Sequence, residues 1–127
     1  MRSPTVLVVD DHAGFRATAR RLLERDGWTV VGEAVDGASA LAAATALAPD
    51  LILLDVGLPD IDGFVVAERL ADNPPDGARR PAVILVSSRD RRTYGARVDD
   101  SPALGFVAKD ELDGSRLFAL MGVGRPR

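Results

Sequence analysis

The chain has 127 residues, 16 of them basic and 19 acidic, so its formal net charge is −3 at pH 7 with its histidine neutral. A chain of this length buries roughly two thirds of the surface that its unfolded form exposes, enough for one hydrophobic core and one domain. It has no cysteine, which excludes a disulfide scaffold, a thiolate zinc site and a cysteine nucleophile. Its only lysine is Lys109 and its only histidine is His12.

These counts also limit metal and membrane chemistry. With one histidine, a metal site has to be rich in carboxylates, which favours hard cations such as Mg²⁺. The apolar runs at 51–54 and 82–86 are far shorter than the ~20 residues that span a bilayer. No charged and then apolar leader precedes Asp10, so we expect a cytoplasmic protein. The weakly acidic balance provides no basic stripe, and direct nucleic-acid binding is not expected.

The first strand is expected at 5–9, where a β-branched apolar run (TVLVV) is typical of a strand buried on both faces. A helix is expected next, ended by Gly27, with a weaker strand after it at 28–31. The inward residues of this helix recur at i, i+4, i+7 and i+8: Phe15, Ala19, Leu22 and Leu23.

The second helix is expected to begin at a cap, Asp36, and to end at Pro49. Its predicted inward residues are Leu41, Ala44 and either Leu47 or Ala48. The third strand is expected at 51–54 and ends at Asp55. Residues 56–63 hold two glycines and a proline, which indicates a loop. The buried side of the helix after it is predicted to hold Phe64, Ala67, Leu70 and Ala71.

The last part of the chain continues the alternation. A polar connection at 73–81 leads to the fourth strand at 82–86. Residues 89–100 have few apolar positions, so any helix there is short, and Pro102 ends it. The fifth strand is expected at 104–107. The buried side of the last helix is predicted to hold Leu112, Leu117, Leu120 and Met121. We expect residues 1–121 to form the domain and 122–127 to be a tail or the start of a linker.

Five strands alternating with helices predict an α/β fold with a five-stranded parallel sheet. The apolar strands require helices on both faces of that sheet. The commonest order for such a doubly wound (βα)5 chain is the flavodoxin-like 2-1-3-4-5. In that order, ligands bind outside the carboxyl ends of the strands, where the winding reverses between strands one and three.

Polar residues collect at those carboxyl ends. They are Asp10 and Asp11 after the first strand, Asp55 after the third, Ser87 after the fourth and Lys109 after the fifth. Three neighbouring carboxylates repel one another unless a proton or a cation offsets their charge. Mg²⁺ binds one or two carboxylates together with a phosphate oxygen of a substrate. The set therefore predicts a site for phosphate on a metal ion.

Each residue of this set also has an ordinary interpretation, such as a helix cap, a turn or a solvated side chain. Their conjunction at four strand ends favours the functional interpretation. We expect His12 to be a loop residue near the site rather than a phosphate donor. Trp28 and Tyr94 are expected to be packing or surface residues.

Several short motifs, in order, resemble the bacterial response-regulator receiver domain from Thr5 to about Met121. The motifs are Val8-Val9-Asp10-Asp11, Leu53-Leu54-Asp55 with Leu58-Pro59 and Gly63, Val86-Ser87-Ser88, and Gly105-Phe106-Val107-Ala108-Lys109. The Asp-Asp-His start, and Asp110 where many receivers have proline, are similar to the NarL/LuxR subgroup.

The resemblance implies a role for each matching residue. Asp55 would be the phosphoacceptor, receiving a phosphoryl group from a sensor histidine kinase or a phosphotransfer protein. Mg²⁺ or Mn²⁺ would be held by Asp10, Asp11, Asp55 and the Gly57 backbone carbonyl. Lys109 and Ser87 would contact the phosphoryl group, and Ser87 and the aromatic Phe106 would form the switch that changes the output surface. These roles are implied for the following residues: Asp10, Asp11, Asp55, Gly57, Ser87, Phe106 and Lys109.

The family also implies an output partner or a C-terminal effector domain, and a possible homodimer on phosphorylation. Gly57 and Arg89 stand where receivers control water access to the phosphoryl group. Two features depart from the family pattern: Ser101-Pro102-Ala103-Leu104 replaces the usual small residues, and no helix-turn-helix domain follows. One alternative is a receiver-like module that acts without phosphorylation. Another, a haloacid-dehalogenase-type hydrolase, requires a second Asp where this chain has Gly57.

Overall fold

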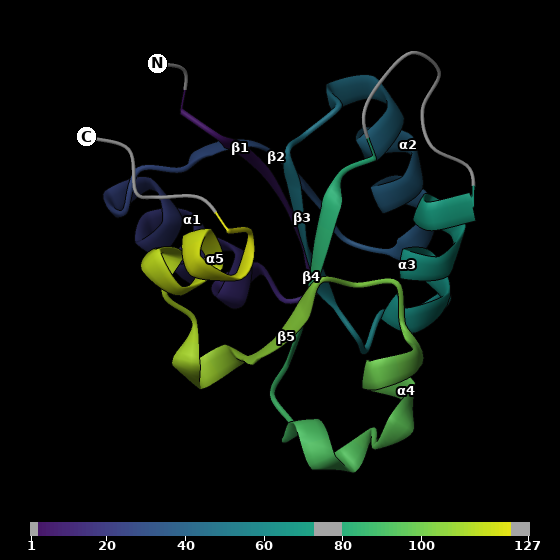
Figure 1. Cartoon of the computed structure of the whole chain (residues 1–127). Coiled ribbons are helices and arrows are strands. Elements are labelled where there is room, and N and C mark those ends of the chain that lie inside the picture. Colours follow the sequence, from purple (N-terminus) through teal and green to yellow (C-terminus); the bar gives the residue numbers. More distant parts are fainter. Residues whose placement is uncertain (1–2, 73–79, 123–127) are drawn as a thin grey trace.

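The computed structural model describes residues 3–72 and 80–122. Its centre is a five-stranded parallel sheet in the order β2-β1-β3-β4-β5, as the sequence predicts (Figure 1). The strands are β1 Thr5–Val9, β2 Thr29–Ala34, β3 Leu51–Asp55, β4 Ala82–Ser87 and β5 Gly105–Ala108. The expected connection at 73–81 lies mostly outside the described residues.

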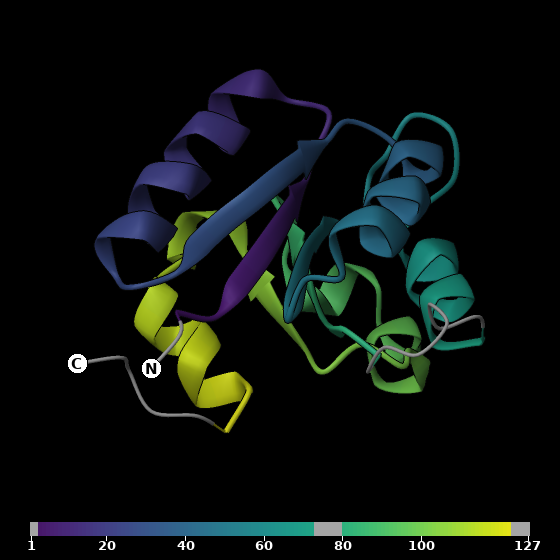
Figure 2. The same ribbon diagram turned by 90° about the horizontal axis from the view of Figure 1, so that it is seen from above.

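Helices cover both faces of the sheet (Figures 1 and 2). On one face lie α1 Ala13–Arg25 and α5 Gly114–Leu120, and on the other lie α2 Gly37–Leu47, α3 Gly63–Asp72 and α4 Ala96–Asp100. Two short 3₁₀ turns, η1 Arg91–Thr93 and η2 Lys109–Glu111, follow β4 and β5. Within the described residues, no helix is long and apolar enough to cross a membrane.

Alternate residues of each strand enter two different cores. Val6 and Val8 of β1 pack toward α1 and α5, whereas Leu7 and Val9 pack toward α2 and α3. All four side chains are fully buried. This is why the inner strands are nearly continuous apolar runs rather than alternating ones.

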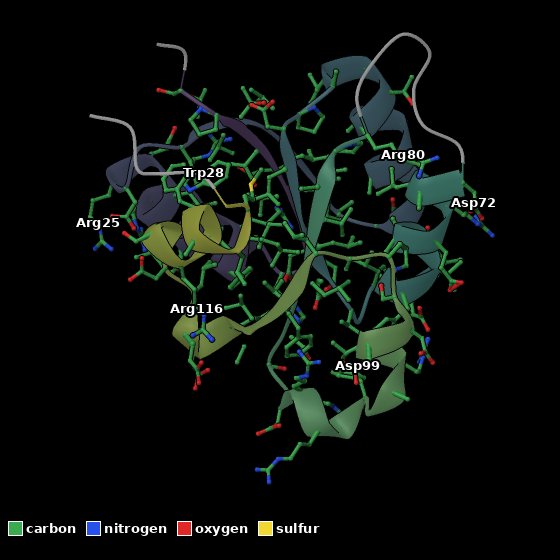
Figure 3. The ribbon with its side chains drawn as sticks, viewed as in Figure 1. Arg25, Trp28, Asp72, Arg80, Asp99 and Arg116 are labelled. Carbon is green, nitrogen blue, oxygen red and sulfur yellow. The ribbon has the colours of Figure 1, made fainter. Side chains whose placement is uncertain are left out.

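The core under α1 and α5 is built around an aromatic pair. The Trp28 ring stacks on the Phe118 ring with centroids 4.5 Å apart, and the Trp28 indole N–H donates to the Gly114 carbonyl at 3.1 Å. Asp26 Oδ2 accepts from the Gly114 N–H at 3.0 Å. Trp28 is labelled beside α5 in Figure 3. These contacts fasten α5 to the turn between α1 and β2, so the prediction of Trp28 as a packing residue is confirmed.

The predicted second strand is too short. β2 extends to Ala34, and its second half is missed because it lies at the sheet edge, where the exposed Glu33 breaks the apolar run. Its register against β1 also shifts, so that Val6 pairs with Val30 but Leu7 pairs with Gly32. An edge strand with a bulge produces a weak apolar signal in the sequence.

The predicted inward face of α2 is also partly wrong. Leu47 is 43% exposed and Ala48 is exposed, whereas the residues buried against the sheet are small: Gly37, Ala40 and Ala44. Leu47 instead lies over Gly32, and a Cβ built on Gly32 would come within 2.7 Å of the Leu47 Cδ1 atom. The hydrophobic side chain thus covers the edge strand rather than the core.

The segment between β4 and β5 holds only short helical pieces, as its sparse apolar residues predict. α4 has five residues, and Val98 is the one that is buried. Gly95 joins η1 to α4 with φ 54° and ψ −131°, a backbone conformation that favours glycine. This segment is therefore attached to the sheet by few apolar contacts.

Candidate functional site

Strand register brings the predicted carboxylates together. Val9 of β1 pairs with Leu54 of β3, so the residues that follow them, Asp10 and Asp55, emerge at the same edge of the sheet. Asp55 in turn pairs with Val86, which precedes Ser87 on β4. The carboxyl ends of β1, β3 and β4 therefore present these side chains side by side.

Lys109 completes a buried charge cluster with two carboxylates. Asp10 is 0% exposed and Asp55 is 5% exposed. The Lys109 Nζ atom lies 2.5 Å from Asp10 Oδ2 and 3.7 Å from Asp55 Oδ1. One positive charge thus faces two buried negative charges, with Asp11 nearby at the more exposed rim.

The Lys109 ammonium group is also held by an aromatic ring. Its Nζ atom lies 4.6 Å from the centroid of Phe15, which α1 directs toward the site. A cation over an aromatic face is attracted by the quadrupole of the ring. Phe15, predicted only as a core residue, therefore also positions the lysine.

The environment of Asp55 opposes its ionisation. Burial raises the pKa of the Asp55 carboxyl above its usual value, and the negative charge of Asp10 raises it further. Lys109 and the Gly57 backbone N–H, which donates to Asp55 Oδ1 at 3.3 Å, act in the opposite direction. Burial and the Asp10 charge prevail, so an added cation at this edge would favour the charged form.

The donor set fits a hard divalent cation. Asp10 Oδ2 is the one buried side-chain oxygen or nitrogen among the described residues without a well-directed hydrogen bond; its contact is the ion pair with Lys109. Asp10, Asp11, His12 and Asp55 each offer a ligand atom, all within 4.8 Å of one another. Three of the four donors are carboxylates, the ligands that Mg²⁺ and Mn²⁺ prefer.

His12 lies at the start of α1, beside the carboxylates. Its Nδ1 atom is 3.0 Å from Asp10 Oδ1 and 3.1 Å from Asp11 Oδ1, and its backbone N–H donates to Asp10 Oδ1 at 2.8 Å. The sequence places it near the site, as the structure does, although the contact with both carboxylates is closer than expected for a loop neighbour.

Ser87 is 4% exposed and makes two contacts through its hydroxyl group. It accepts a hydrogen bond from the Arg89 backbone N–H at 3.0 Å, and its Oγ atom lies 2.7 Å from the Tyr94 hydroxyl oxygen. Tyr94, expected to be only a packing or surface residue, thus reaches a predicted site residue. No spacing rule indicates this contact in the sequence, because the two residues meet through a turn.

The remaining predicted residues lie around this centre. Phe106 is half-buried on β5, with its ring centroid 5.8 Å from that of Tyr94. Gly57 is exposed in the loop after β3, where a Cβ would meet nothing within 4 Å. The Arg89 side chain is exposed beyond Ser87.

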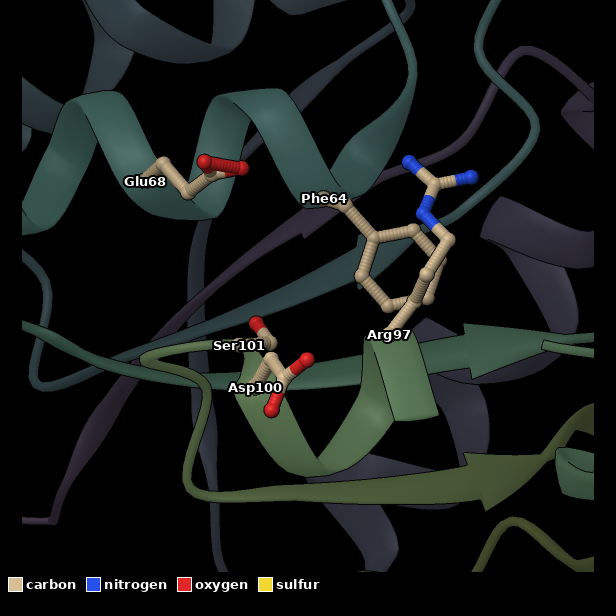
Figure 4. Close-up of a pocket in the computed structure, with 5 residues that line it drawn as sticks. All are labelled: Phe64, Glu68, Arg97, Asp100 and Ser101. Atoms are coloured by element: carbon tan, nitrogen blue, oxygen red, sulfur yellow. The ribbon is translucent and has the colours of Figure 1, made fainter. Parts of the chain in front are cut away.

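A separate pocket lies between α3 and α4 (Figure 4). Its volume is about 200 Å³, and it is lined by Phe64, Glu68, Arg97, Asp100 and Ser101. The Arg97 guanidinium lies 4.3 Å from the Phe64 ring centroid and donates to Asp62 Oδ2 at 2.7 Å. None of the predicted site residues lines this pocket.

Comparison with known proteins identifies the family. Residues 6–121 match the response regulator receiver domain, and the chain belongs to this family. The resemblance drawn from the sequence motifs is thereby confirmed, as is the parallel α/β fold.

Three related proteins illustrate the match. A Pseudomonas aeruginosa protein described as a transcriptional regulator is 42% identical over 106 residues, covering 84% of this chain and 49% of that protein. The DNA-binding transcriptional activator EvgA of Escherichia coli is 32% identical over 105 residues, covering 83% and 50%. The receiver domain of NarL from Mycobacterium tuberculosis has a TM-score of 0.83 and 33% identity, with 96% and 99% covered. The chain thus spans about half the length of the Pseudomonas aeruginosa and Escherichia coli relatives.

Proposed function

We propose that this receiver accepts a phosphoryl group on Asp55 from the phosphohistidine of a sensor histidine kinase or a phosphotransfer protein. The observation that carries the proposal is the buried Asp55 carboxylate beside Asp10 and Lys109. Burying a carboxylate costs free energy, because burial penalises its charge. The retention of Asp55 at this buried position therefore supports a functional role. Residues 1–121 form the receiver in this proposal, and 122–127 are a tail or the start of a linker.

The transfer exchanges one bond to phosphorus for another. An Asp55 carboxylate oxygen attacks the phosphorus atom, the bond to the donor histidine nitrogen breaks, and its electron pair returns to the imidazole. Charge in the loose transition state is spread over the three equatorial oxygens, so catalysis depends mostly on the placement of cations. Lys109, held over the Phe15 ring, supplies one positive charge at this position.

Asp10, Asp11, Asp55 and the Gly57 carbonyl would hold Mg²⁺ or Mn²⁺. The bound ion would offset the charge of the transferring phosphoryl group. The unfavourable burial of Asp10 and Asp55 supports this assignment, because the two carboxylates share a single lysine.

In this proposal, phosphorylation is signalled by a change in the shape of the protein surface. Ser87 would donate a hydrogen bond to a phosphoryl oxygen on Asp55, and its movement would allow Phe106 to change its packing. Both residues lie next to the weakly attached η1 and α4 segment, which supports a change on that side of the sheet.

The lifetime of the aspartyl phosphate would depend on Gly57 and Arg89. Gly57 leaves space for a water molecule, and the Arg89 guanidinium can shield the phosphoryl group. Substituting Gly57→Met or Arg89→Ala is expected to change the half-life measured by the decay of the phosphorylated mass. An unchanged half-life in both variants would contradict this local control.

The relatives are named as transcriptional regulators, so we propose that this receiver acts in the cytoplasm on a DNA-binding effector domain or an output partner. Phosphorylation would also favour a homodimer, which light scattering before and after phosphorylation would detect. The receiver itself is not proposed to bind nucleic acid.

The direct test uses acetyl phosphate and Mg²⁺ with the purified chain. We expect one added phosphoryl group in the intact mass of the wild type, none in Asp55→Asn, and none in the wild type with a chelator. Ser88→Ala, which removes an exposed hydroxyl beside Ser87, is the matched control and should accept the group normally. An unmodified wild type would favour the alternative, a receiver-like module that acts without phosphorylation.

A further inference from the structure

Tyr94, the only tyrosine in the chain, directs its hydroxyl group at Ser87. The two oxygens are 2.7 Å apart, and Ser87 Oγ also accepts from the Arg89 N–H at 3.0 Å. A serine hydroxyl has one proton and two lone pairs. The Ser87 Oγ atom is therefore held by two partners, and either hydroxyl of the Ser87–Tyr94 pair can be the donor.

The same tyrosine also packs against the proposed switch aromatic. The Tyr94 ring centroid lies 5.5 Å from that of Phe64 and 5.8 Å from that of Phe106. Phe106 has no hydroxyl group and cannot form a hydrogen bond with Ser87 through its side chain. Tyr94 is thus the side chain that touches Ser87 through a polar atom and Phe106 through its ring.

The backbone connects Tyr94 to α4. Its N–H donates to the Arg91 carbonyl at 3.1 Å, and its carbonyl accepts from the Arg97 N–H at 3.2 Å. Gly95, with its positive φ, follows directly. A displacement of the Tyr94 backbone would therefore move the start of α4 as well.

We propose that Tyr94 is a positioning residue that holds the Ser87 hydroxyl in the unphosphorylated protein and is released when Asp55 is phosphorylated. This inference rests on the proposed function. Once Ser87 turns toward the phosphoryl group, its Oγ atom moves away from the Tyr94 hydroxyl, and the bond between them is lost. The bond thus favours the unphosphorylated state, and its release frees Tyr94, Phe106 and α4 to repack.

The first test measures the affinity for beryllofluoride, an analogue of the phosphoryl group on aspartate, by calorimetry with Mg²⁺. Tyr94→Phe keeps the ring but removes the hydroxyl, so we expect binding to tighten about 2- to 10-fold, the range for one hydrogen bond. Thr93→Val removes an exposed hydroxyl from the same turn and should have no effect. In a Ser87→Ala background, Tyr94→Phe should also have no effect.

The second test observes the bond itself. Because the chain has one tyrosine, protein labelled with ¹³Cζ-tyrosine gives a single side-chain NMR signal. We expect Ser87→Ala to shift this signal, and beryllofluoride to shift the wild-type signal in the same direction. A signal that does not respond to Ser87→Ala, or a bond that persists with beryllofluoride, would overturn the inference.

The two levels of the proposal fail in different ways. If the wild type binds no beryllofluoride, or binds it no more tightly than Asp55→Asn does, both the proposed function and the role of Tyr94 are overturned. A wild type that binds it at Asp55, with unchanged or weaker binding in Tyr94→Phe, overturns the role of Tyr94 alone. An equal effect of Tyr94→Phe with and without the Ser87 hydroxyl also contradicts it.

Discussion

The α1 and α5 side of the sheet and the η1 and α4 side are held by different kinds of contact. On the first side, Trp28 stacks on Phe118 and bonds to Gly114, and the neighbouring Leu23 and Leu117 side chains are fully buried. On the second side, α4 buries only Val98. The half-buried Tyr94 packs against Phe64 and Phe106, and polar contacts of half-buried or exposed groups add to the attachment. We therefore expect the first side to stay in place and the second side to move more readily.

The acidic site lies between these two sides. Ser87 and Tyr94 connect it to the loosely attached side, and Lys109 connects it through Phe15 to α1. Under the proposed function, phosphorylation of Asp55 would displace the weaker side while the stronger side keeps the sheet and Lys109 in position. Elements that move in signalling are drawn from the less stable parts of a fold.

The largest expected effect is on the well-packed side. Trp28→Ala should lower the free energy of unfolding by about 3–5 kcal/mol, since it leaves a large cavity and an unpartnered Gly114 carbonyl. Urea unfolding measures this loss, with Trp28→Phe as a milder control. A loss below that of Val98→Ala would contradict the contrast between the two sides.

The second effect comes from the site and has a defined pH dependence. The pKa of Asp55 is raised in the folded chain by burial and by the Asp10 charge. The protonated Asp55 carboxyl therefore contributes its full stability below the pKa that it has in the unfolded chain. This contribution is lost as the pH rises through the higher pKa of the folded chain. Asp55→Asn cannot ionise, so without metal it should be more stable than the wild type at neutral pH.

This difference should disappear in acid, where the wild-type carboxyl is protonated. Added Mg²⁺ should raise the thermal midpoint of the wild type more than that of Asp55→Asn, because binding to the folded state stabilises it. An Asp55→Asn variant that is less stable than the wild type at neutral pH would refute the electrostatic account.

On the weakly attached side, Val98→Ala should cost about 1.5 kcal/mol, from two buried carbons at ~0.8 kcal/mol each. Native-state hydrogen exchange should show faster exchange confined to α4 and its flanking turns. Destabilisation as large as that of Trp28→Ala, or spread through α1 and α5, would show that this side is part of the rigid core.

The smallest expected effect is at the α3 and α4 pocket. Arg97→Ala removes an exposed ion pair with Asp62 and a cation–π contact with Phe64, together about 1 kcal/mol or less. Arg97→Lys should lose part of this because the planar guanidinium stacks better. Chemical unfolding at low and high salt separates the two contributions, and a larger loss than in Val98→Ala would contradict the ranking.

Sequence alone predicts the parts of this protein that depend on strand order. The apolar runs ending in Asp10 and Asp55 reveal inner strands, and parallel order brings their carboxyl ends together. The same reasoning fails at the edge, where Glu33 and the shifted register conceal half of β2. It also misplaces Leu47, because small residues allow α2 to lie close to the sheet.

The contact between Ser87 and Tyr94 could not be predicted in this way. It depends on the 3₁₀ turn η1, which ends at Tyr94, and no hydrophobic periodicity indicates such a geometry. The contact between Phe15 and Lys109 could not be predicted either. The helical spacing of Phe15 predicts that it is buried, but not that a cation lies beside its ring.

The most direct test of the central claim is amide hydrogen exchange of the chain before and after phosphorylation with acetyl phosphate and Mg²⁺. We predict that exchange changes in residues 87–101 and 105–109, and stays constant in α1 and α5. The Asp55→Asn variant should show no change in either region. Altered exchange concentrated in α1 and α5, with 87–101 unaffected, would contradict the account.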